Sequence, residues 1–409
     1  MKHIVILGAG TGGTMMANRL ARRLPSSEWK ITVVDRDGDH VYQPGLLFLP
    51  FGDSRREELV RPRTLFLPPH VELVLRAVER VEPEHSRVAF QDGSSLRYDF
   101  LIVATGTRIV PEATAGLTGP GWRRNTFDFY TLDGAEALGR ALSELKGGRL
   151  VLNVVEMPIK CPVAPLEFLF LADAFLTQRG IRDRVELALA TPLDGAFTKP
   201  RAAAMLGGML DRKGIQVVPN FNVEAVDTEK RVLRSYDNRE EPYDLLVTIP
   251  QHQGSELVAR SGLGNDTGFI PTDKHTLQSK AFPNIFVLGD ATDLPSSKAG
   301  SVAHFQSEVL TENVLCAVAG KPFGASFDGH ANCFIETGFG RAMLIDFNYE
   351  TEPLPGRFPL PGVGPFTLLE ESHVNHWGKL GFRWVYWNML ITGRDLPLDH
   401  RMVMAGKWS

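Results

Sequence analysis

The chain has little cysteine, no excess of positive charge and no long apolar run. Three cysteines occur in 409 residues, at the separated positions Cys161, Cys316 and Cys333. So few and so scattered, they exclude the disulfide framework of a small secreted domain, although two of them could still form a redox pair. The net charge of −4 provides no basic surface for neutralising phosphates, which excludes a nucleic-acid-binding role.

No run of 18 apolar residues free of charge occurs, so no membrane-spanning helix is predicted. The first apolar run begins at His3 and is needed as a strand, which leaves no room for a signal peptide and favours synthesis in the cytoplasm without export. A hydrophobic content of 43% with 22% charged residues is typical of a globular protein. The length predicts two or three domains, and we expect no metal site.

Glycine is missing from one place where it would be expected. The stretch Glu156–Glu167 lies between an apolar strand-like run, 150–155, and a helix-like run that begins behind Pro165. In α/β proteins such a strand-to-helix turn usually binds a nucleotide phosphate and is rich in glycine. No glycine occurs between Gly148 and Gly180, and Cys161 stands in the turn. We interpret this turn as a nucleotide site replaced by a redox thiol.

A glycine-rich turn is present near the N-terminus. The β-branched run His3–Leu7 predicts a buried parallel strand. A helix is predicted after the glycines and then a second strand that ends at Asp35, 22 positions after Gly13. This order of elements predicts dinucleotide binding, with the acid close to a ribose hydroxyl. The glycines of this turn are Gly8, Gly10, Gly12 and Gly13.

Two later strands resemble motifs of the flavoproteins with two dinucleotide-binding domains. Tyr98–Thr107 runs into a turn of small residues that contains Thr105 and Gly106, and Asn284–Asp290 ends in Gly289 and Asp290. In that superfamily the late acid lies near the ribityl chain and pyrophosphate of FAD. The resemblance implies an α/β fold with two Rossmann-like dinucleotide-binding domains, the second inserted into the first.

Between the two halves of the FAD domain, strands and helices alternate, which predicts a second parallel sheet. Its predicted strands are 149–155, 185–190, 216–218 and 243–249, with helices over 166–178 and 199–213 and a hairpin over 222–236. The predicted domains are 1–125 and 272–325 for the FAD domain, 126–271 for the degenerate second Rossmann-like domain, and 326–409 for a C-terminal redox and membrane-docking region.

The sequences around two cysteines carry a more specific resemblance. I-K-C-P-V-A-P-L-E surrounds Cys161 and H-A-N-C-F-I-E-T-G-F-G-R-A surrounds Cys333, while K-A-G-S-V-A-H-F-Q lies over Lys298–Gln306 and I-D-F-N-Y over Ile345–Tyr349. Over essentially its whole length the chain resembles sulfide:quinone oxidoreductase, with flavocytochrome c sulfide dehydrogenase as a relative.

This resemblance implies that sulfide is oxidised by a Cys161–Cys333 pair beside the flavin and that a membrane quinone takes the electrons. It implies proton handling by Glu167, for which a solvated helix position is the alternative. FAD is expected to be non-covalent, because Asn125–Asp133 lacks the third cysteine of some family members. The expected FAD contacts are Gly8, Gly10, Gly12, Gly13, Asp35, Arg36, Val78, Thr105, Gly106, Gly289, Asp290, Lys298 and Gly300. Gly300 and Phe334 are expected to contact quinone.

Local charge predicts an activated thiol. Cys161 precedes a helix, whose N-terminus is partly positive, and Lys160 adds a cation beside it. Both effects should lower the pKa of the thiol and raise the thiolate population. His304 is a candidate on the quinone or donor side, with a structural histidine as the alternative, and Cys316 is expected to be a buried inert thiol.

The C-terminal composition differs from the rest. Four of the six tryptophans lie after His373, and basic residues outnumber acids there. Such a composition on a short amphipathic helix is typical of an interfacial anchor, so we expect a peripheral protein on the cytoplasmic face of a membrane. Packing on the protein's own core or on a subunit partner is the alternative, and a homo-oligomer is compatible with the sequence. The residues at helical spacing are Trp377, Leu380, Trp384, Trp387 and Ile391.

Three other enzymatic functions share parts of this pattern. A type II NADH:quinone oxidoreductase needs a glycine-rich loop in the second domain, which is missing here. A soluble sulfide dehydrogenase flavoprotein with a cytochrome partner stays open. Disulfide reductases of the glutathione kind carry their cysteines just behind the first Rossmann unit, and no cysteine precedes Cys161.

Overall fold

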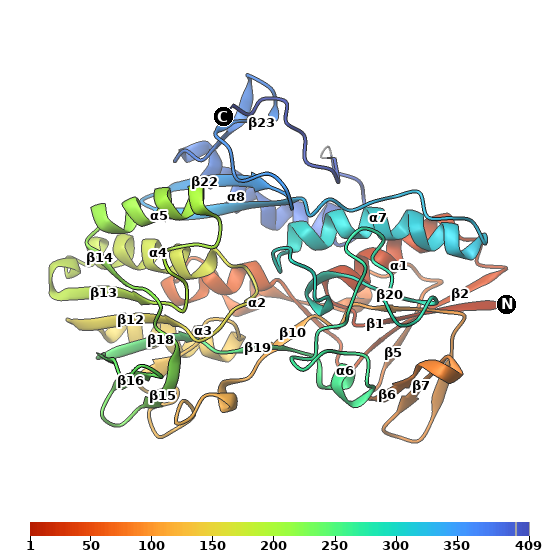
Figure 1. The fold of residues 1–409 in the computed structure, drawn as a ribbon, viewed down its shortest axis with the longest axis horizontal. Coiled ribbons are helices and arrows are strands. Elements are labelled where there is room, and N and C mark those ends of the chain that lie inside the picture. Colours follow the sequence, from red (N-terminus) through yellow and green to blue (C-terminus); the bar gives the residue numbers. More distant parts are fainter. Residues whose placement is uncertain (397–398, 409) are drawn as a thin grey trace.

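The computed structural model describes residues 1–396 and 399–408, and these form two α/β lobes and a C-terminal part. Figure 1 shows the N-terminal lobe and the inserted lobe side by side, with the C-terminal part lying across one side of both. No helix within the described residues is long and apolar enough to cross a membrane.

The first sheet is parallel and five-stranded. Its third strand in space is the predicted N-terminal strand, and the late strand near residue 286 pairs beside β9. Ile4 and Ile6 pack into one core and Val5 and Leu7 into another, because alternate side chains point to opposite faces of a strand. In spatial order the strands are β20 (Ile285–Val287), β9 (Phe100–Val103), β1 (Lys2–Leu7), β2 (Trp29–Asp35) and β5 (Glu72–Leu75).

Helices cover one face of this sheet and small antiparallel strands the other (Figure 1). The helices α1 (Thr11–Arg23) and α7 (Gly300–Val318) pack against each other. A short helix, α2, lies between β3 and the paired strand β4. The remaining elements are β3 (Asp39–Val41), α2 (Arg56–Leu59), β4 (Val60–Pro62), β6 (Val78–Glu82), β7 (Arg87–Phe90), β8 (Ser95–Arg97) and α6 (Glu256–Arg260).

The second sheet is also parallel, and it confirms the predicted second Rossmann-like unit. Its strands in spatial order are β11 (Thr126–Phe127), β18 (Leu245–Ile249), β12 (Gly148–Val154), β13 (Val185–Ala190) and β14 (Ile215–Val218). Its helices are α3 (Leu132–Glu144), α4 (Ala164–Gln178) and α5 (Pro200–Arg212). The predicted hairpin is the antiparallel set β15 (Val223–Asp227), β16 (Val232–Ser235) and β17 (Glu240–Pro242). Two short strands, β10 (Thr107–Ile109) and β19 (His252–Gly254), pair where the chain passes between the lobes.

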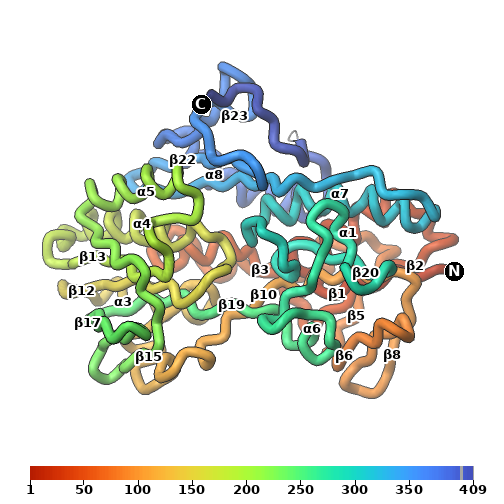
Figure 2. The backbone as a smooth tube through the Cα atoms, viewed as in Figure 1, coloured from red at the N-terminus to blue at the C-terminus, as the bar shows by residue number. Residues whose placement is uncertain are grey.

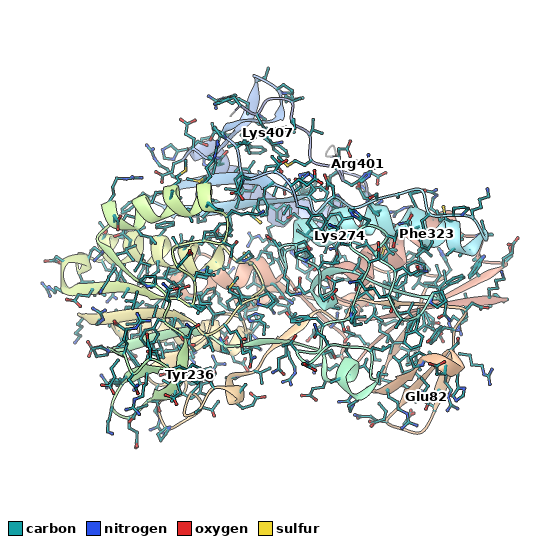
Figure 3. The ribbon with its side chains drawn as sticks, in the orientation of Figure 1. Glu82, Tyr236, Lys274, Phe323, Arg401 and Lys407 are labelled. Carbon is teal, nitrogen blue, oxygen red and sulfur yellow. The ribbon has the colours of Figure 1, made fainter. Side chains whose placement is uncertain are left out.

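The C-terminal part is a four-stranded sheet with one helix. The strands lie in the order β21 (Ala331–Gly338), β22 (Arg341–Phe347), β24 (Gly364–Leu368) and β23 (Gly356–Leu360). Helix α8 (His373–Val385) packs on β21 and β22 and continues into a π-helical turn, Tyr386–Leu390. The tube in Figure 2 shows the chain returning to this sheet, where Lys407 (Figure 3) forms a buried ion pair with Asp346 at 2.7 Å.

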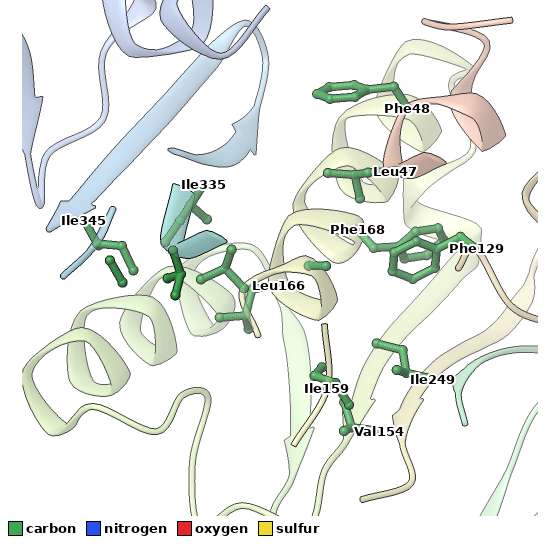
Figure 4. Close-up of a cluster of buried hydrophobic side chains, with 14 of the residues drawn as sticks. Leu47, Phe48, Phe129, Val154, Ile159, Leu166, Phe168, Ile249, Ile335 and Ile345 are labelled. Atoms are coloured by element: carbon green, nitrogen blue, oxygen red, sulfur yellow. The ribbon is translucent and has the colours of Figure 1, made fainter. Parts of the chain in front are cut away.

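One apolar core connects the three parts. Leu166 of α4 lies against Ile335 of β21 and Ile345 of β22, as Figure 4 shows. In the same cluster the rings of Phe129 and Phe168 stack with centroids 5.1 Å apart. The C-terminal sheet is therefore fixed on the helix that begins just after Cys161.

Candidate redox site

The β1–α1 turn has the geometry of a phosphate-binding loop. A side chain at Gly13 would strike the carbonyl of Gly8 across the turn, and one at Gly8 would strike the backbone of Ala104 just after β9, so both must be glycine. A side chain at Gly10 would meet nothing within 4 Å, so the space in front of the helix is open. No side chain caps α1, whose first amides are free to bind an anion.

Asp35 lies at the end of β2, beside this turn. Its carboxylate accepts hydrogen bonds from the backbone N–H groups of Ala9 and Arg36, each at 2.7 Å. Arg63 forms an ion pair with it at 3.3 Å and also donates to the carbonyl of Ala9. Arg63 thus fixes the glycine turn to the acid, a role that the sequence analysis missed. The side chain of Arg36 itself is exposed.

Three further expected FAD residues lie at element ends of the same lobe: Thr105 and Gly106 follow β9, and Gly300 begins α7. Gly106 and Gly300 have open space in front of them, like Gly10. The buried hydroxyls of Thr105 and Thr107 have no partner among the described residues, which is typical of a site that a ligand completes. Open glycines, free helix amides and unpartnered buried hydroxyls at one edge of a Rossmann sheet fit FAD.

The ammonium of Lys298 bonds backbone carbonyls of the protein and does not point into the open space at the expected FAD site. Its buried ammonium donates to the carbonyls of Asp290, at 2.9 Å, and Thr292, at 2.8 Å, and burial lowers its pKa to about 8. It thereby shapes the Gly289–Asp290 turn, which follows β20. Burial raises the pKa of Asp290, and the cation of Lys298 opposes this. Val78 opens β6, just after β5.

Cys161 lies in a strained turn between β12 and α4. Its φ of 49° is in the left-handed region, which non-glycine residues seldom occupy. Its N–H donates to the carbonyl of Lys298 at 2.7 Å and its carbonyl accepts from Ala164 at 2.8 Å, so both lobes hold it. The amides of Leu166 and Glu167 are bonded to Val163, and Pro162 and Pro165 have none. This helix start therefore offers few amides to a phosphate.

Cys333 lies on β21, opposite Ile345 of β22. The start of α7 approaches it, because Ser301 donates to the carbonyl of Asn332 at 2.7 Å. The two thiols are close enough for the charge of Cys333 to raise the pKa of Cys161. All three cysteines are free in this structure, and Cys316 lies on α7, where it is partly buried.

Glu167 is buried beside both thiols, and the alternative of a solvated helix position is wrong. One carboxylate oxygen lies 4.0 Å from the Cys161 sulfur and the other accepts the backbone N–H of Glu336 at 2.8 Å. Lys379 of α8 forms an ion pair with this second oxygen and donates to the carbonyl of Phe334 at 3.0 Å. In the sequence, Lys379 is distinguished only as one of the basic residues after His373.

The expected activation of Cys161 by Lys160 is wrong. The ammonium of Lys160 turns away and donates to the side chain of Gln43 at 3.1 Å. Burial, followed by the charge of Glu167, raises the pKa of Cys161 and brings that of Cys333 to about 12. The cation that lowers both pKa values is Lys379. Its contribution comes from a helix more than 200 positions further along the chain, so the local sequence gave no sign of it.

Phe334 lies on the face of β21 that points toward α8. Its ring meets Phe366 edge-on, with centroids 5.1 Å apart, and both rings touch the position of Gly378. Gly300, the other expected quinone residue, is the first residue of α7 and directly precedes Ser301. His304 is buried one turn further along α7, where burial and Arg19 lower its pKa to about 4, and its nitrogens have no hydrogen-bond partner among the described residues.

The tryptophan-rich face of the tail divides in two. Trp377 and Trp384 are 66% and 63% exposed, and Leu380 is also exposed. Trp387 and Ile391, predicted on the same face, are buried. The reason is the π-helical turn, which changes the helical phase and places Trp387 against Phe66, with ring centroids 5.1 Å apart. Only the first part of the predicted face is therefore free. Further exposed apolar side chains of the C-terminal part are Leu360, Val363, Val374, Val403, Met404 and Trp408.

Known proteins share this sequence and fold. A family model for pyridine nucleotide-disulphide oxidoreductases matches residues 2–154. The mitochondrial sulfide:quinone oxidoreductase of Mus musculus is 26% identical over 398 residues, which cover 96% of this chain and 86% of that protein. The Dictyostelium discoideum enzyme is 28% identical over 397 residues, again 96% and 86%. The X-ray structure of sulfide:quinone oxidoreductase from Aquifex aeolicus aligns with a TM-score of 0.79 and 21% identity, covering 96% of this chain and 92% of that one. With its FAD-type glycine turn and its two thiols at one site, the chain is similar over 96% of its length to the sulfide:quinone oxidoreductases, and its N-terminal part matches the pyridine nucleotide-disulphide oxidoreductases.

Proposed function

We propose that this protein oxidises sulfide through a Cys161–Cys333 disulfide and persulfide relay and passes two electrons by way of FAD to a membrane quinone, releasing polysulfide or sulfur. The observation that carries the proposal is the meeting of the two thiols at Glu167 and Lys379. Two cysteines from different parts of the chain share one buried carboxylate and one buried cation there. Idle core cysteines would need neither group.

Each group has a role in thiol–disulfide exchange. Hydrosulfide attacks one sulfur of the disulfide, the bond between the cysteines breaks, and the other cysteine leaves as a thiolate. Lys379 stabilises that thiolate, because its charge lowers the pKa of both cysteines. Glu167, 4.0 Å from the Cys161 sulfur, accepts the proton of the new persulfide. FAD supplies the two-electron acceptor for the step that restores the disulfide and releases the added sulfur.

The second lobe supports sulfide rather than a nicotinamide as the electron donor. Its helix start after Cys161 has two prolines, and the amides of Ala164, Leu166 and Glu167 are bonded within the turn. A pyrophosphate would find few donors there, in contrast to the open turn at Gly10. This favours sulfide oxidation over the NADH:quinone alternative.

The exposed face of α8 supports a membrane quinone as the electron acceptor. Trp377 and Trp384 lie on the helix whose inner side carries Lys379 and packs on Phe334. Exposed tryptophans beside basic residues are typical of a surface that enters a membrane interface. Docking through this face would bring quinone to the aromatic side chains Phe334 and Phe366 without passage through water.

Anaerobic flavin bleaching tests the function. Sulfide should bleach the bound flavin, a short-chain quinone should restore its absorbance, and NADH should do neither. Cys333→Ser should keep its FAD but lose bleaching by sulfide. Bleaching by NADH, or unchanged bleaching by sulfide in Cys333→Ser, would contradict the proposal.

Vesicle flotation tests the docking surface. Trp377→Glu together with Trp384→Glu should release the protein from vesicles that contain anionic lipid. Tyr236→Glu is a matched control, because Tyr236 is 72% exposed on the inserted lobe, away from the C-terminal part (Figure 3). Equal flotation of the wild type and the double variant would refute docking through α8.

A further inference from the structure

A row of charged side chains continues from Glu167 toward the surface. Glu336 of β21 is buried, and its carboxylate accepts from the ring N–H of His376 on α8 at 3.0 Å. The His376 side chain is 22% exposed, whereas that of Glu336 is 1% exposed. His376 and Lys379 are three positions apart on α8 and therefore lie on the same face. The row begins at the Cys161 sulfur and ends at a group that meets solvent.

Lys379 is paired with one buried carboxylate, that of Glu167, and is within range of the charge of a second, that of Glu336. The charges of Glu167 and Glu336 both raise its pKa. Lys379 bonds Glu167 directly, and the backbone N–H of Glu336 bonds the same carboxylate oxygen. The two acids are thus held near one cation by β21 itself.

The charges of this group do not balance without one more proton. Two carboxylates and one ammonium leave a net charge of −1 in a buried place, which is costly. Burial accordingly raises the pKa of Glu336. The Glu336–His376 pair can hold the missing proton, because it is the member of the row that reaches solvent. Asp53 is the other charged group facing His376; burial raises the pKa of Asp53, and the charge of the histidine opposes this effect.

We propose that Glu336 and His376 form the proton exit of the thiol site, a role that rests on the proposed sulfide oxidation. Hydrogen sulfide that ends as zero-valent sulfur gives up two electrons and two protons. A proton taken by Glu167 gives the row one proton too many, so His376 releases one to solvent. One proton enters at Glu167 for each proton that leaves at His376, and no net charge accumulates. Glu336 and His376 touch no substrate and act through Glu167 and Lys379.

Three variants test the exit by stopped-flow bleaching and by proton release into an indicator dye. His376→Ala should slow both by at least about tenfold at neutral pH, and added imidazole should restore them. Glu336→Gln should slow both, with no recovery in imidazole, because the missing group is internal. His373→Ala is the control, since this exposed histidine of the same helix bonds the carbonyl of Gly340 instead. It should behave as the wild type.

Labelling of Cys161 by iodoacetamide tests the proposal without enzyme turnover. In the reduced protein, Glu336→Gln removes a negative charge beside Lys379, so iodoacetamide should label Cys161 faster than in the wild type at the same pH. Unchanged labelling would overturn the proposal. So would wild-type bleaching rates and pH profile in His376→Ala, or slow bleaching that imidazole does not restore. If sulfide fails to bleach the wild type, the proposed function itself is wrong. If the wild type bleaches and His376→Ala matches it, only the exit is wrong.

Discussion

The two strand-to-helix turns of this protein occupy equivalent places in two Rossmann-like lobes but have opposite chemistry. The turn from β1 to α1 is open at Gly10 and presents unbonded amides. The turn from β12 to α4 contains two prolines, bonds the amides of Ala164, Leu166 and Glu167 within itself and carries the sulfur of Cys161. The same architecture thus provides an anion site where glycine removes side chains and a thiol site where proline removes donors.

The largest expected effect separates the functions of the two turns. Cys161→Ala should reduce sulfide-dependent flavin bleaching by about a thousandfold or more, because the nucleophilic exchange needs the sulfur. The amount of bound FAD should not change, since Cys161 is outside the glycine turn. Stopped-flow bleaching and the flavin-to-protein absorbance ratio measure the two effects. Loss of FAD from this variant would show that the turns are not independent.

The converse change fills the open turn. Gly10→Leu should weaken FAD binding by up to about 3 kcal/mol, a little over a hundredfold, because the new side chain occupies the space in front of α1. The apoprotein should unfold at the wild-type temperature, since nothing in the protein lies within 4 Å of that position. Gly207→Leu, at an equally open glycine of α5, is the matched control for FAD titration by fluorescence quenching.

The buried thiol of Cys333 should lose its proton only at a higher pH than an ordinary thiol does. Because burial raises the pKa of Cys333 to about 12, its labelling by iodoacetamide in the reduced protein should rise about tenfold per pH unit to pH 10 without levelling off. An ordinary thiol, with a pKa of about 8.5, levels off near pH 9.5. The folded state holds this proton more tightly than the unfolded state, so the reduced protein should also lose stability as pH rises above about 9. Mass spectrometry of Cys333, with Cys316 as a remote reference, would detect a plateau that contradicts this.

The smallest effect concerns backbone strain at Cys161. With a φ of 49°, any residue bearing a β-carbon is disfavoured there by about 1 kcal/mol, and glycine is not. Cys161→Gly should therefore be more stable than Cys161→Ala by roughly that amount, less the greater flexibility of glycine in the unfolded chain. Thermal unfolding of the two variants with FAD bound gives the comparison. A less stable glycine variant would mean that the turn is not strained.

The sequence alone determined the features that depend on neighbours in the chain. Alternation of apolar strands and helices predicted both parallel sheets, because burial on both faces of a strand leaves a continuous apolar run. The glycines and the spacing from Gly13 to Asp35 predicted the first turn, whose geometry the structure shows. The two cysteines were picked out by the sequences around them, which resemble those of a known family.

Only the tertiary structure decided the electrostatics of the thiol site. Lys160 is the neighbour of Cys161 in sequence, yet its ammonium bonds Gln43, while Lys379 arrives from α8. Likewise the π-helical turn buried Trp387, although its spacing matched that of Trp377. Charge effects act through space over a few ångströms, and burial depends on what packs above a residue. Neither the distances between side chains nor their burial can be derived from their positions along the chain. The pKa values of the thiols and the exposed face of α8 therefore follow only from the fold.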